Sequence, residues 1–143
     1  MSKIRLDSDD IKYITMFETL TGASITDCVQ EDSVMGFLVK KGDMGLAIGK
    51  NGANIERVRK AMGKSIIVME SSENLEDFVK NVFRPVKIKK SRTQKTEQGN
   101  TLVIEIDKKD RKWVIGSEGN RIKIAKKLAK RHYGIDDINV KVN

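Results

Sequence analysis

Apolar and polar positions along the first half of the chain predict helices joined to short strands. Residues 8–20 place apolar side chains at three-residue spacing, which predicts a helix that ends at Gly22. Runs rich in β-branched and aromatic residues then predict strands, because such residues pack well on a pleated sheet. The expected order after this helix is strand 25–30, strand 34–40, a short helical turn, helix 53–62 and strand 65–69.

The second half of the chain predicts the same order. Apolar residues on one face predict a helix over 74–83, which Pro85 stops, and the alternation over 86–89 predicts a strand. The tract 91–100 has the composition of a loop within a hairpin. The expected order then continues with strand 101–106, a short helical turn, helix 120–131 and strand 138–142.

A direct repeat supports this doubling. Shifting the sequence by 67 positions places residues 43–55 over residues 110–122, with five identities in thirteen positions. The identical residues are one Asp, two Ile and two Gly, at the points where a strand, a turn and a helix need them. The sequence therefore predicts an α+β protein of two tandem domains, 1–72 and 73–143, with no flexible linker between them.

Each copy carries a Gly-x-x-Gly loop, over 49–52 and 116–119, between a short helical turn and a longer helix. Glycine at both ends opens backbone conformations that other residues rarely adopt and removes two Cβ atoms from the surface. The first N–H groups of the following helix have no partners within that helix, so an anion can sit against the turn. One such loop is weak evidence for a binding site, whereas two loops in the same context are much stronger evidence.

The loop sequences IGKNG (48–52) and IGSEG (115–119) resemble the signature loops of KH domains. The order of elements resembles the type II arrangement, in which an extra helix and strand precede the core. Two tandem type II domains of this length resemble the archaeal NusA-like transcription termination factors, over about residues 8–142. The resemblance implies that each domain is a three-stranded mixed sheet covered by three helices.

The resemblance also implies how RNA would bind. Each domain would grip about four single-stranded nucleotides, with the loop against the sugar-phosphate backbone and the bases in an apolar groove. Carried over by position, the first clamp is Gly49, Lys50, Asn51 and Gly52, and the second clamp is Gly116, Ser117, Glu118 and Gly119. The residues expected to support the groove wall from the core are Ile48, Ile55, Ile115 and Ile122.

The two clamps differ in ways that bear on binding. Glu118 places a carboxylate where a phosphate should pass, and the second clamp contains no lysine to offset it. The segment between the long helix and the last strand flanks the groove in type II domains. This segment is only 63–64 in the first copy but about 132–137 in the second, so the two grooves are expected to differ in shape.

The charge of the chain favours a polyanionic partner. There are 28 Lys and Arg against 20 Asp and Glu, which gives a net charge of +8. Residues 1–83 carry 11 basic and 13 acidic side chains, whereas residues 84–143 carry 17 and 7. The basic surface is therefore expected in the second half of the chain.

A lysine stripe is predicted on the helix after the second clamp, where Lys123, Lys126, Lys127 and Lys130 recur at helical spacing. The stripe is either a solvated face or a track for a nucleic-acid backbone. Its lysines are counted, together with Arg121, among the expected RNA contacts. A second basic run, over 87–95, fits either an edge strand guarded by lysines or an RNA contact, and the edge strand is favoured.

Three ring-bearing side chains are candidates for stacking on a base. Trp113 aligns with Leu46, which favours a core position over an exposed one. His132 and Tyr133 fall in the segment expected to flank the second groove and are therefore expected to be better placed for stacking.

The residue inventory argues against other classes of protein. One cysteine and one histidine exclude a disulfide framework and a zinc site built from His and Cys, and no cofactor or small-molecule substrate is expected. No apolar run approaches the roughly 18 residues that a membrane span needs. Residues 45–51 are similar to a P-loop, but three residues rather than four separate the glycines and Asn51 replaces Ser or Thr, so an enzyme is not expected.

Together these features predict a cytoplasmic, monomeric, non-catalytic protein that binds single-stranded RNA. By resemblance, its role is transcription termination or antitermination on nascent RNA, with RNA polymerase as a second partner. The alternative is a structural RNA-binding component of ribosome assembly or of another ribonucleoprotein. The sequence does not separate these two roles.

Overall fold

The computed structural model describes residues 8–143, and the chain divides into two compact units between Ser72 and Glu73. We call these the first unit and the second unit and describe each by itself. Both contain helices and a three-stranded mixed sheet, so the predicted α+β class is confirmed.

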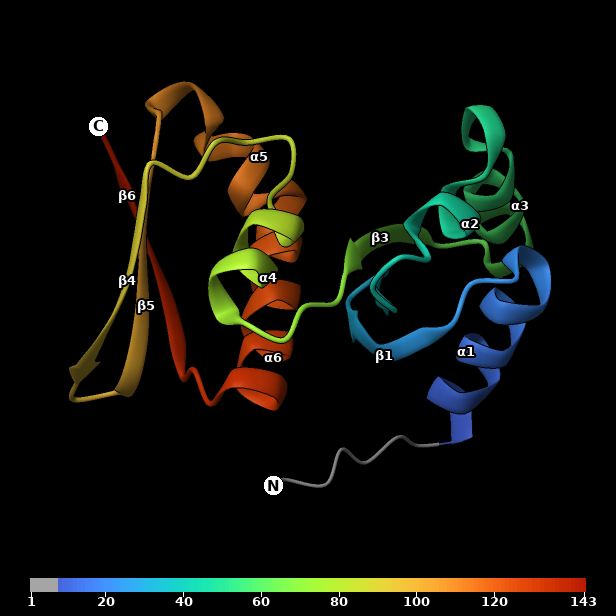
Figure 1. Cartoon of the computed structure of the whole chain (residues 1–143), viewed down its shortest axis with the longest axis horizontal. Coiled ribbons are helices and arrows are strands. Elements are labelled where there is room, and N and C mark those ends of the chain that lie inside the picture. Colours follow the sequence, from blue (N-terminus) through green and yellow to red (C-terminus); the bar gives the residue numbers. More distant parts are fainter. Residues whose placement is uncertain (1–7) are drawn as a thin grey trace. The chain divides into compact units, whose positions relative to one another are not determined.

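The first unit begins with a helix followed by a hairpin. Its elements are α1 (Ser8–Thr21), β1 (Ile25–Glu31), β2 (Val34–Val39), α2 (Met44–Ile48), the 3-10 turn η1 (Lys50–Gly52), α3 (Ala53–Met62) and β3 (Ser65–Glu70). The central strand β2 pairs antiparallel with β1 and parallel with β3. Because a tight turn cannot join parallel strands, the chain crosses from β2 to β3 through α2 and α3 (Figure 1).

An apolar cluster joins the helices of the first unit to its sheet. All six residues of β2 are buried, as expected for a central strand. The rings of Phe17 on α1 and Phe37 on β2 lie 4.6 Å apart between centroids. Ile55 and Val58 of α3 are buried in the same cluster. This packing fixes α3 against the sheet and thereby sets the position of its first turn.

The second unit repeats this order. Its elements are α4 (Leu75–Val82), β4 (Lys90–Thr96), β5 (Gly99–Ile106), η2 (Lys108–Asp110), α5 (Arg111–Ile115), η3 (Ser117–Gly119), α6 (Asn120–Tyr133) and β6 (Asp137–Val142). The central strand β5 is antiparallel to β4 and parallel to β6. Helices α4 to α6 lie on one side of this sheet (Figure 1). Asn74 caps α4, since its Oδ1 accepts a hydrogen bond from the Asp77 N–H at 2.8 Å.

The first strand of the second unit differs from its prediction. The predicted strand 86–89 is wrong: β4 begins at Lys90, and much of the tract predicted as a loop belongs to β4 and the start of β5. β4 contains no apolar residue and is almost wholly exposed, because hydrogen bonds to β5 rather than burial hold it in place. Val86 and Ile88 are instead half-buried in the connection that leads to β4.

The segment between the long helix and the last strand of the second unit is shorter than predicted. α6 continues to Tyr133 and β6 starts at Asp137, so only residues 134–136 connect them. The prediction that His132 and Tyr133 lie in a loop is therefore wrong. The Tyr133 ring packs on the Phe78 ring of α4, with centroids 4.8 Å apart, and is half-buried.

Candidate nucleic-acid interface

The first clamp joins α2 to α3 through the turn η1. The Gly49 N–H donates to the Gly45 carbonyl at 2.9 Å and so closes α2, and the Gly52 N–H donates to the Gly49 carbonyl at 3.1 Å. Lys50 and Asn51 lie between the glycines and are exposed. Within residues 8–143 neither side chain has a hydrogen bond or an ion pair. The clamp therefore presents two unpaired polar side chains at the start of α3.

The second clamp has the same backbone conformation as the first. The φ and ψ angles are 78° and 171° at Gly49 and 82° and 173° at Gly116. They are 55° and 27° at Asn51 and 54° and 25° at Glu118. They are 76° and 15° at Gly52 and 75° and 13° at Gly119. Two loops that share only their glycines thus place Ser117 and Glu118 where the first clamp has Lys50 and Asn51.

The first glycine of each clamp is required by the close approach of the long helix. A Cβ atom at Gly49 would lie 2.6 Å from Asn54 Cγ and 2.8 Å from the Asn54 backbone nitrogen. At Gly116 it would lie 2.7 Å from Arg121 Cβ. The last glycine is required by its backbone conformation instead. A Cβ atom at Gly52 would meet nothing closer than 3.9 Å, but the φ angle of Gly52 is 76°. That left-handed conformation disfavours residues other than glycine.

The packing role of the residue that closes each clamp against the preceding short helix was not predicted from the sequence, which indicated Arg121 only as an RNA contact. Asn54 Nδ2 donates to the Leu46 carbonyl of α2 at 2.8 Å. At the equivalent position, Arg121 places its Cζ 4.6 Å from the centroid of the Trp113 ring and donates to the Val82 carbonyl at 3.5 Å. The repeat aligns these two residues, and the side-chain N–H donor that they share is the signal that could have found them.

Arg121 therefore has a packing role inside the second unit. Burial lowers the pKa of its guanidinium below the ordinary value, because the charged form loses solvation. An arginine still carries its charge at neutral pH, so the contact with the Trp113 ring is a cation–π interaction. The contact of Arg121 with RNA stays a prediction.

The third position of each clamp has a positive φ, which few residues tolerate. Asn51 suits it, because asparagine is enriched in the left-handed region. Glutamate has no such advantage, so Glu118, with φ of 54°, is strained by on the order of 1 kcal/mol. The second clamp thus combines a strained residue with an exposed carboxylate.

The isoleucines beside the clamps divide into two pairs. Ile55 and Ile122, on the long helices, are buried as expected. Ile48 and Ile115, which end the short helices, are only half-buried. Each clamp therefore has accessible apolar surface immediately before its first glycine.

The lysine stripe lies on the outward face of α6. Lys123, Lys127 and Lys130 are exposed, and Lys126 is half-exposed. Lys126 Nζ lies 3.1 Å from Asp137 Oδ1 of β6, so this ion pair compensates part of its charge. Lys123 and Lys130 have no ion-pair partner among the residues that the structure describes. The first and the last lysine of the predicted stripe therefore both carry a positive charge that no ion pair compensates.

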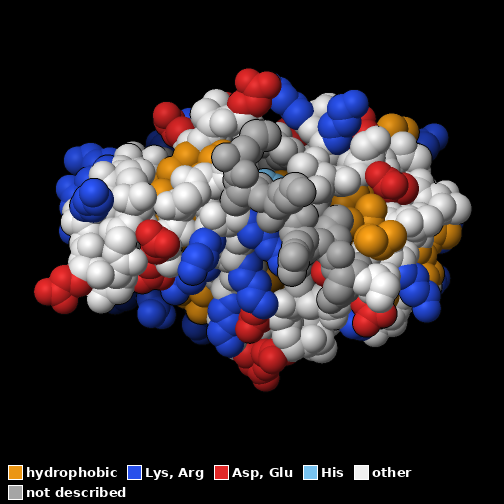
Figure 2. Space-filling model, turned by 90° about the horizontal axis from the view of Figure 1, so that it is seen from below, with side chains coloured by type: hydrophobic (Ala, Val, Ile, Leu, Met, Phe, Trp, Pro, Cys, Tyr) orange, Lys and Arg blue, Asp and Glu red, His pale blue; other side chains and the backbone are white. Residues whose placement is uncertain are grey.

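The net charge is carried by the second unit. The first unit contains 10 basic and 10 acidic side chains, and the second contains 18 and 10. The first unit is therefore neutral, whereas residues 1–83 are slightly acidic, because residues 73–83 carry three acidic side chains and one lysine and belong to the second unit. On the face of the molecule in Figure 2, Lys and Arg side chains stand among scattered Asp and Glu side chains.

Trp113 is exposed, so the prediction of a core position is wrong. Its exposed fraction is 47%, and that of Leu46 in the first unit is 50%. The equivalence of the two positions holds, but both face outward. The reason is the shortness of α2 and α5, which bury Ala47 and Val114 and have too few residues to bury a second large side chain.

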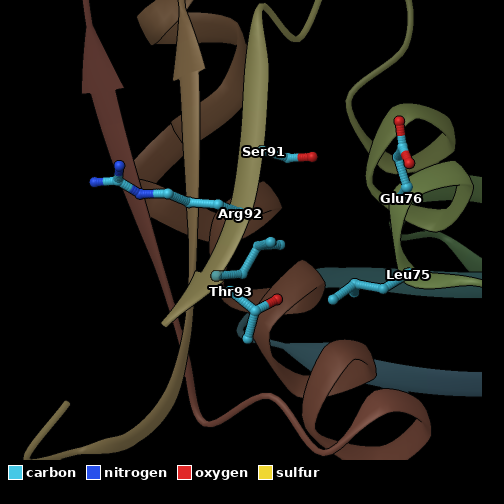
Figure 3. A pocket seen from close by; sticks show the side chains of 6 residues that line it. Leu75, Glu76, Ser91, Arg92 and Thr93 are labelled. Carbon is cyan, nitrogen blue, oxygen red and sulfur yellow. The ribbon is translucent and has the colours of Figure 1, made fainter. Parts of the chain in front are cut away.

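A hollow of about 280 Å³ lies between β4 and α4, lined by Leu75, Glu76, Ser91, Arg92, Thr93 and Leu102 (Figure 3). Ser91 points toward the helix that carries Glu76, whereas Arg92 points to the other side of the strand (Figure 3). β4 is an edge strand, which fits the favoured interpretation of the basic run. The hollow contains no residue of either clamp.

Across residues 8–143, no three or more His, Cys, Asp or Glu side chains are grouped so that they could hold a metal ion. No helix in this part of the chain combines the length and the apolar character that crossing a membrane requires.

The fold and the paired clamps define a KH-type protein. A family model described as "KH domain" matches residues 11–98, from α1 to the turn after β4. The second clamp lies beyond the matched residues, so its assignment rests on the backbone conformation that it shares with the first.

Relatives narrow this class to one family. The chain is 35% identical to a Methanococcus vannielii protein named "Probable transcription termination protein NusA", over 96% of this chain and 80% of the relative. A Methanocaldococcus jannaschii protein of the same name is 34% identical, over 98% of this chain and 76% of that one. A Halobacterium salinarum protein of that name is 33% identical, over 96% and 98%. The chain belongs to the archaeal NusA-like family of KH proteins.

A solved structure supports the fold over nearly the whole chain. The crystal structure of APE1850 matches with a TM-score of 0.81 at 30% sequence identity. The match covers 95% of this chain and 100% of that one.

Alanine substitutions should separate the two glycine requirements of the first clamp. Gly52→Ala should lower the free energy of unfolding by about 1–2 kcal/mol, because alanine is strained in the left-handed conformation that Gly52 adopts. Gly49→Ala should lower it by about 2–4 kcal/mol, because the new methyl group overlaps Asn54 in addition to the strain of a positive φ. Urea unfolding followed through amide signals of α3 would measure both.

Gly45→Ala is the matched control, since Gly45 lies in α2 and nothing approaches its Cβ position within 4 Å. It should be neutral or slightly stabilising. Equal losses at Gly49 and Gly52 would contradict the close-approach argument.

Proposed function

We propose that the chain is a non-catalytic transcription termination factor that binds nascent single-stranded RNA through two tandem type II KH domains, residues 1–72 and 73–143. Membership of the archaeal NusA-like family supports the role in termination. The observation that carries the proposal is the shared conformation of the two clamps, each at the start of a helix in a unit with a mixed three-stranded sheet. RNA polymerase in the cytoplasm is the proposed second partner.

In the first domain, the proposed grip on RNA is local and direct. The start of α3 offers backbone N–H groups and the positive end of the helix dipole to a phosphate. Lys50 adds an ammonium group to the same place, and Asn51 adds an amide that can donate to a phosphate or sugar oxygen. Ile48 supplies apolar surface for the adjoining base.

In the second domain, the proposed grip relies more on charge at a distance. Ser117 offers one hydroxyl donor, while Glu118 repels a passing phosphate. The lysines of α6, above all Lys123 and Lys130, compensate by attracting the backbone alongside the helix. The two domains thus contribute different kinds of contact to RNA binding.

Charge reversal in the first clamp tests the direct contact. The double variant Lys50→Asp with Asn51→Asp should bind a randomised pool of single-stranded RNA on the order of tenfold or more weakly, because two carboxylates face the phosphate. Aspartate tolerates positive φ, so the loop should keep its conformation. Fluorescence anisotropy of labelled RNA measures the affinity.

The control is Lys60→Asp, which changes an exposed lysine at the other end of α3. It should have a much smaller effect. Termination assays with an archaeal RNA polymerase then test the transcriptional role, since the double variant should lose its effect on termination efficiency. If the double variant binds RNA as tightly as the wild type, the assignment of the first clamp is wrong. If it binds RNA more weakly but terminates transcription as the wild type does, the proposed role in transcription is wrong.

Replacing Glu118 should improve the second clamp. Glu118→Gln and Glu118→Asn both remove the repelling charge, so each should raise RNA affinity a few-fold. Only Glu118→Asn also suits positive φ, so only this variant should stabilise the second unit, by about 1 kcal/mol. Affinity and urea unfolding, measured together, separate charge from strain. If both affinities stay at the wild-type value, no phosphate passes Glu118.

The salt dependence of binding decides between the two interpretations of the lysine stripe. Each phosphate neutralised on single-stranded RNA contributes about −0.7 to the slope of log K against log salt. Lys123→Ala with Lys130→Ala should therefore flatten the slope by about 1.4 if both lysines contact the backbone. Lys60→Ala, at an exposed site of the first unit, should leave the slope as it is. An unaltered slope in the double variant would identify the stripe as a solvated face.

A further inference from the structure

A second hollow, which no clamp residue lines, lies beside α5 in the second unit. Its volume is about 370 Å³, and its lining residues are Pro85, Val86, Lys87, Lys109, Asp110 and Trp113. Ligand sites are typically hollows of at least about 300 Å³ with apolar walls and a few polar groups. We call this hollow the Trp113 pocket. Its walls come from the connection between α4 and β4 and from the turn and helix that precede the second clamp.

The wall of the Trp113 pocket includes a large aromatic ring that is held in place. The cation–π contact with Arg121 covers one part of the ring and restrains its rotation. Arg121 does not line the pocket, so its guanidinium leaves the hollow open. Nearly half of the Trp113 surface stays exposed, with an exposed fraction of 47%. A fixed, accessible indole is a stacking surface for a flat ring.

The polar groups of the pocket are two cations and one carboxylate. Lys87 and Lys109 are exposed, and within the described chain neither ammonium group has an ion-pair partner. The Asp110 carboxylate makes no capping hydrogen bond to α5, although Asp110 precedes that helix. The pocket therefore offers positive charge for a phosphate and an acceptor for N–H donors.

The first unit lacks the aromatic part of this arrangement. The position of Trp113 is occupied there by Leu46, and Asn54 replaces Arg121. Asn54 bonds to the backbone of Leu46 rather than to a ring. The aspartate is common to both copies, as Asp43 and Asp110. The stacking surface is thus a feature of the second unit alone among the two copies.

We propose that the Trp113 pocket binds one nucleotide of the RNA outside the four-nucleotide stretches held by the clamps, and that it prefers guanine. The base would stack on Trp113, with Pro85 and Val86 against its other side and Lys87 and Lys109 near the flanking phosphates. Guanine is preferred because its N1–H and its amino group present two parallel donors to the two oxygens of the Asp110 carboxylate. This inference rests on the proposed function, since it takes the ligand to be RNA.

The single tryptophan makes the pocket directly observable, because all indole fluorescence comes from Trp113. The full chain is titrated with uridine decamers that carry one guanosine, moved along the decamer, and with the all-uridine decamer. The guanosine decamers should quench the fluorescence and bind on the order of tenfold more tightly at the best position. Guanosine 5′-monophosphate alone should quench, and uridine 5′-monophosphate should not.

Three variants identify the contacts, with affinities measured by fluorescence anisotropy of labelled decamers, because the Trp113 variants contain no tryptophan. Trp113→Leu, which introduces the residue found at the same place in the first unit, should weaken binding of the best guanosine decamer about tenfold, and Trp113→Phe should restore most of the affinity. Asp110→Asn should reduce the difference between the guanosine and uridine decamers. Ile11→Ala, which trims another exposed apolar side chain, should have no effect.

The outcomes separate this inference from the proposed function. If RNA binds the clamps but neither quenches Trp113 nor responds to Trp113→Leu, the pocket proposal is overturned and the proposed function stands. If no RNA binds the wild type even at low salt, the proposed function is lost. The pocket proposal is lost with it, because its ligand is a nucleotide of that RNA. Quenching by an acidic peptide, with none by RNA or monophosphates, would overturn the proposal in favour of a protein partner.

Discussion

The close approach of each long helix to the first glycine of its clamp is the contact on which the rest of the site depends. No Cβ atom fits at Gly49 or Gly116, because the residue five positions later already occupies that space. The chain can therefore turn from the short helix into the long one within four residues. This tight turn holds the second and third loop residues out in solvent at a helix start, so the proposed binding chemistry follows from a steric constraint.

The same contact gives the two units different outer surfaces. Asn54 satisfies the constraint with a short side chain that ends on the backbone of α2. Arg121 satisfies it with a long one that continues to the Trp113 ring and to the end of α4. The atoms of Asn54 and Arg121 nearest the clamp both pack against its first glycine, whereas the outer parts of the two side chains make different contacts. A repeat can in this way keep its clamp and still diverge in what lies beside it.

Features that leave a local pattern were predictable from the sequence, and features fixed by distant partners were not. α3 has its predicted bounds, because its apolar spacing and the flanking glycines are local signals. β4 was missed because its polar residues are held by the ladder to β5 and carry no burial pattern. The core position expected of Trp113 and the loop position expected of Tyr133 were both wrong, since side-chain size does not reveal that α5 is too short to bury the first ring or that α6 carries the second onto Phe78.

The separation of charge from clamp quality has a kinetic consequence under the proposed function. Charges further apart than a Debye length of about 8 Å are largely screened at physiological salt, so the charge of one unit acts mainly on RNA already near that unit. The second unit, with 18 basic and 10 acidic side chains, attracts the polyanion and accelerates encounter. The neutral first unit adds little to that attraction, but under the proposed function it would hold RNA through close contacts of Lys50 and Asn51, and such contacts govern dissociation. The proposed function thereby assigns encounter and retention to different units, and retention by the first clamp would allow the second clamp to keep Glu118.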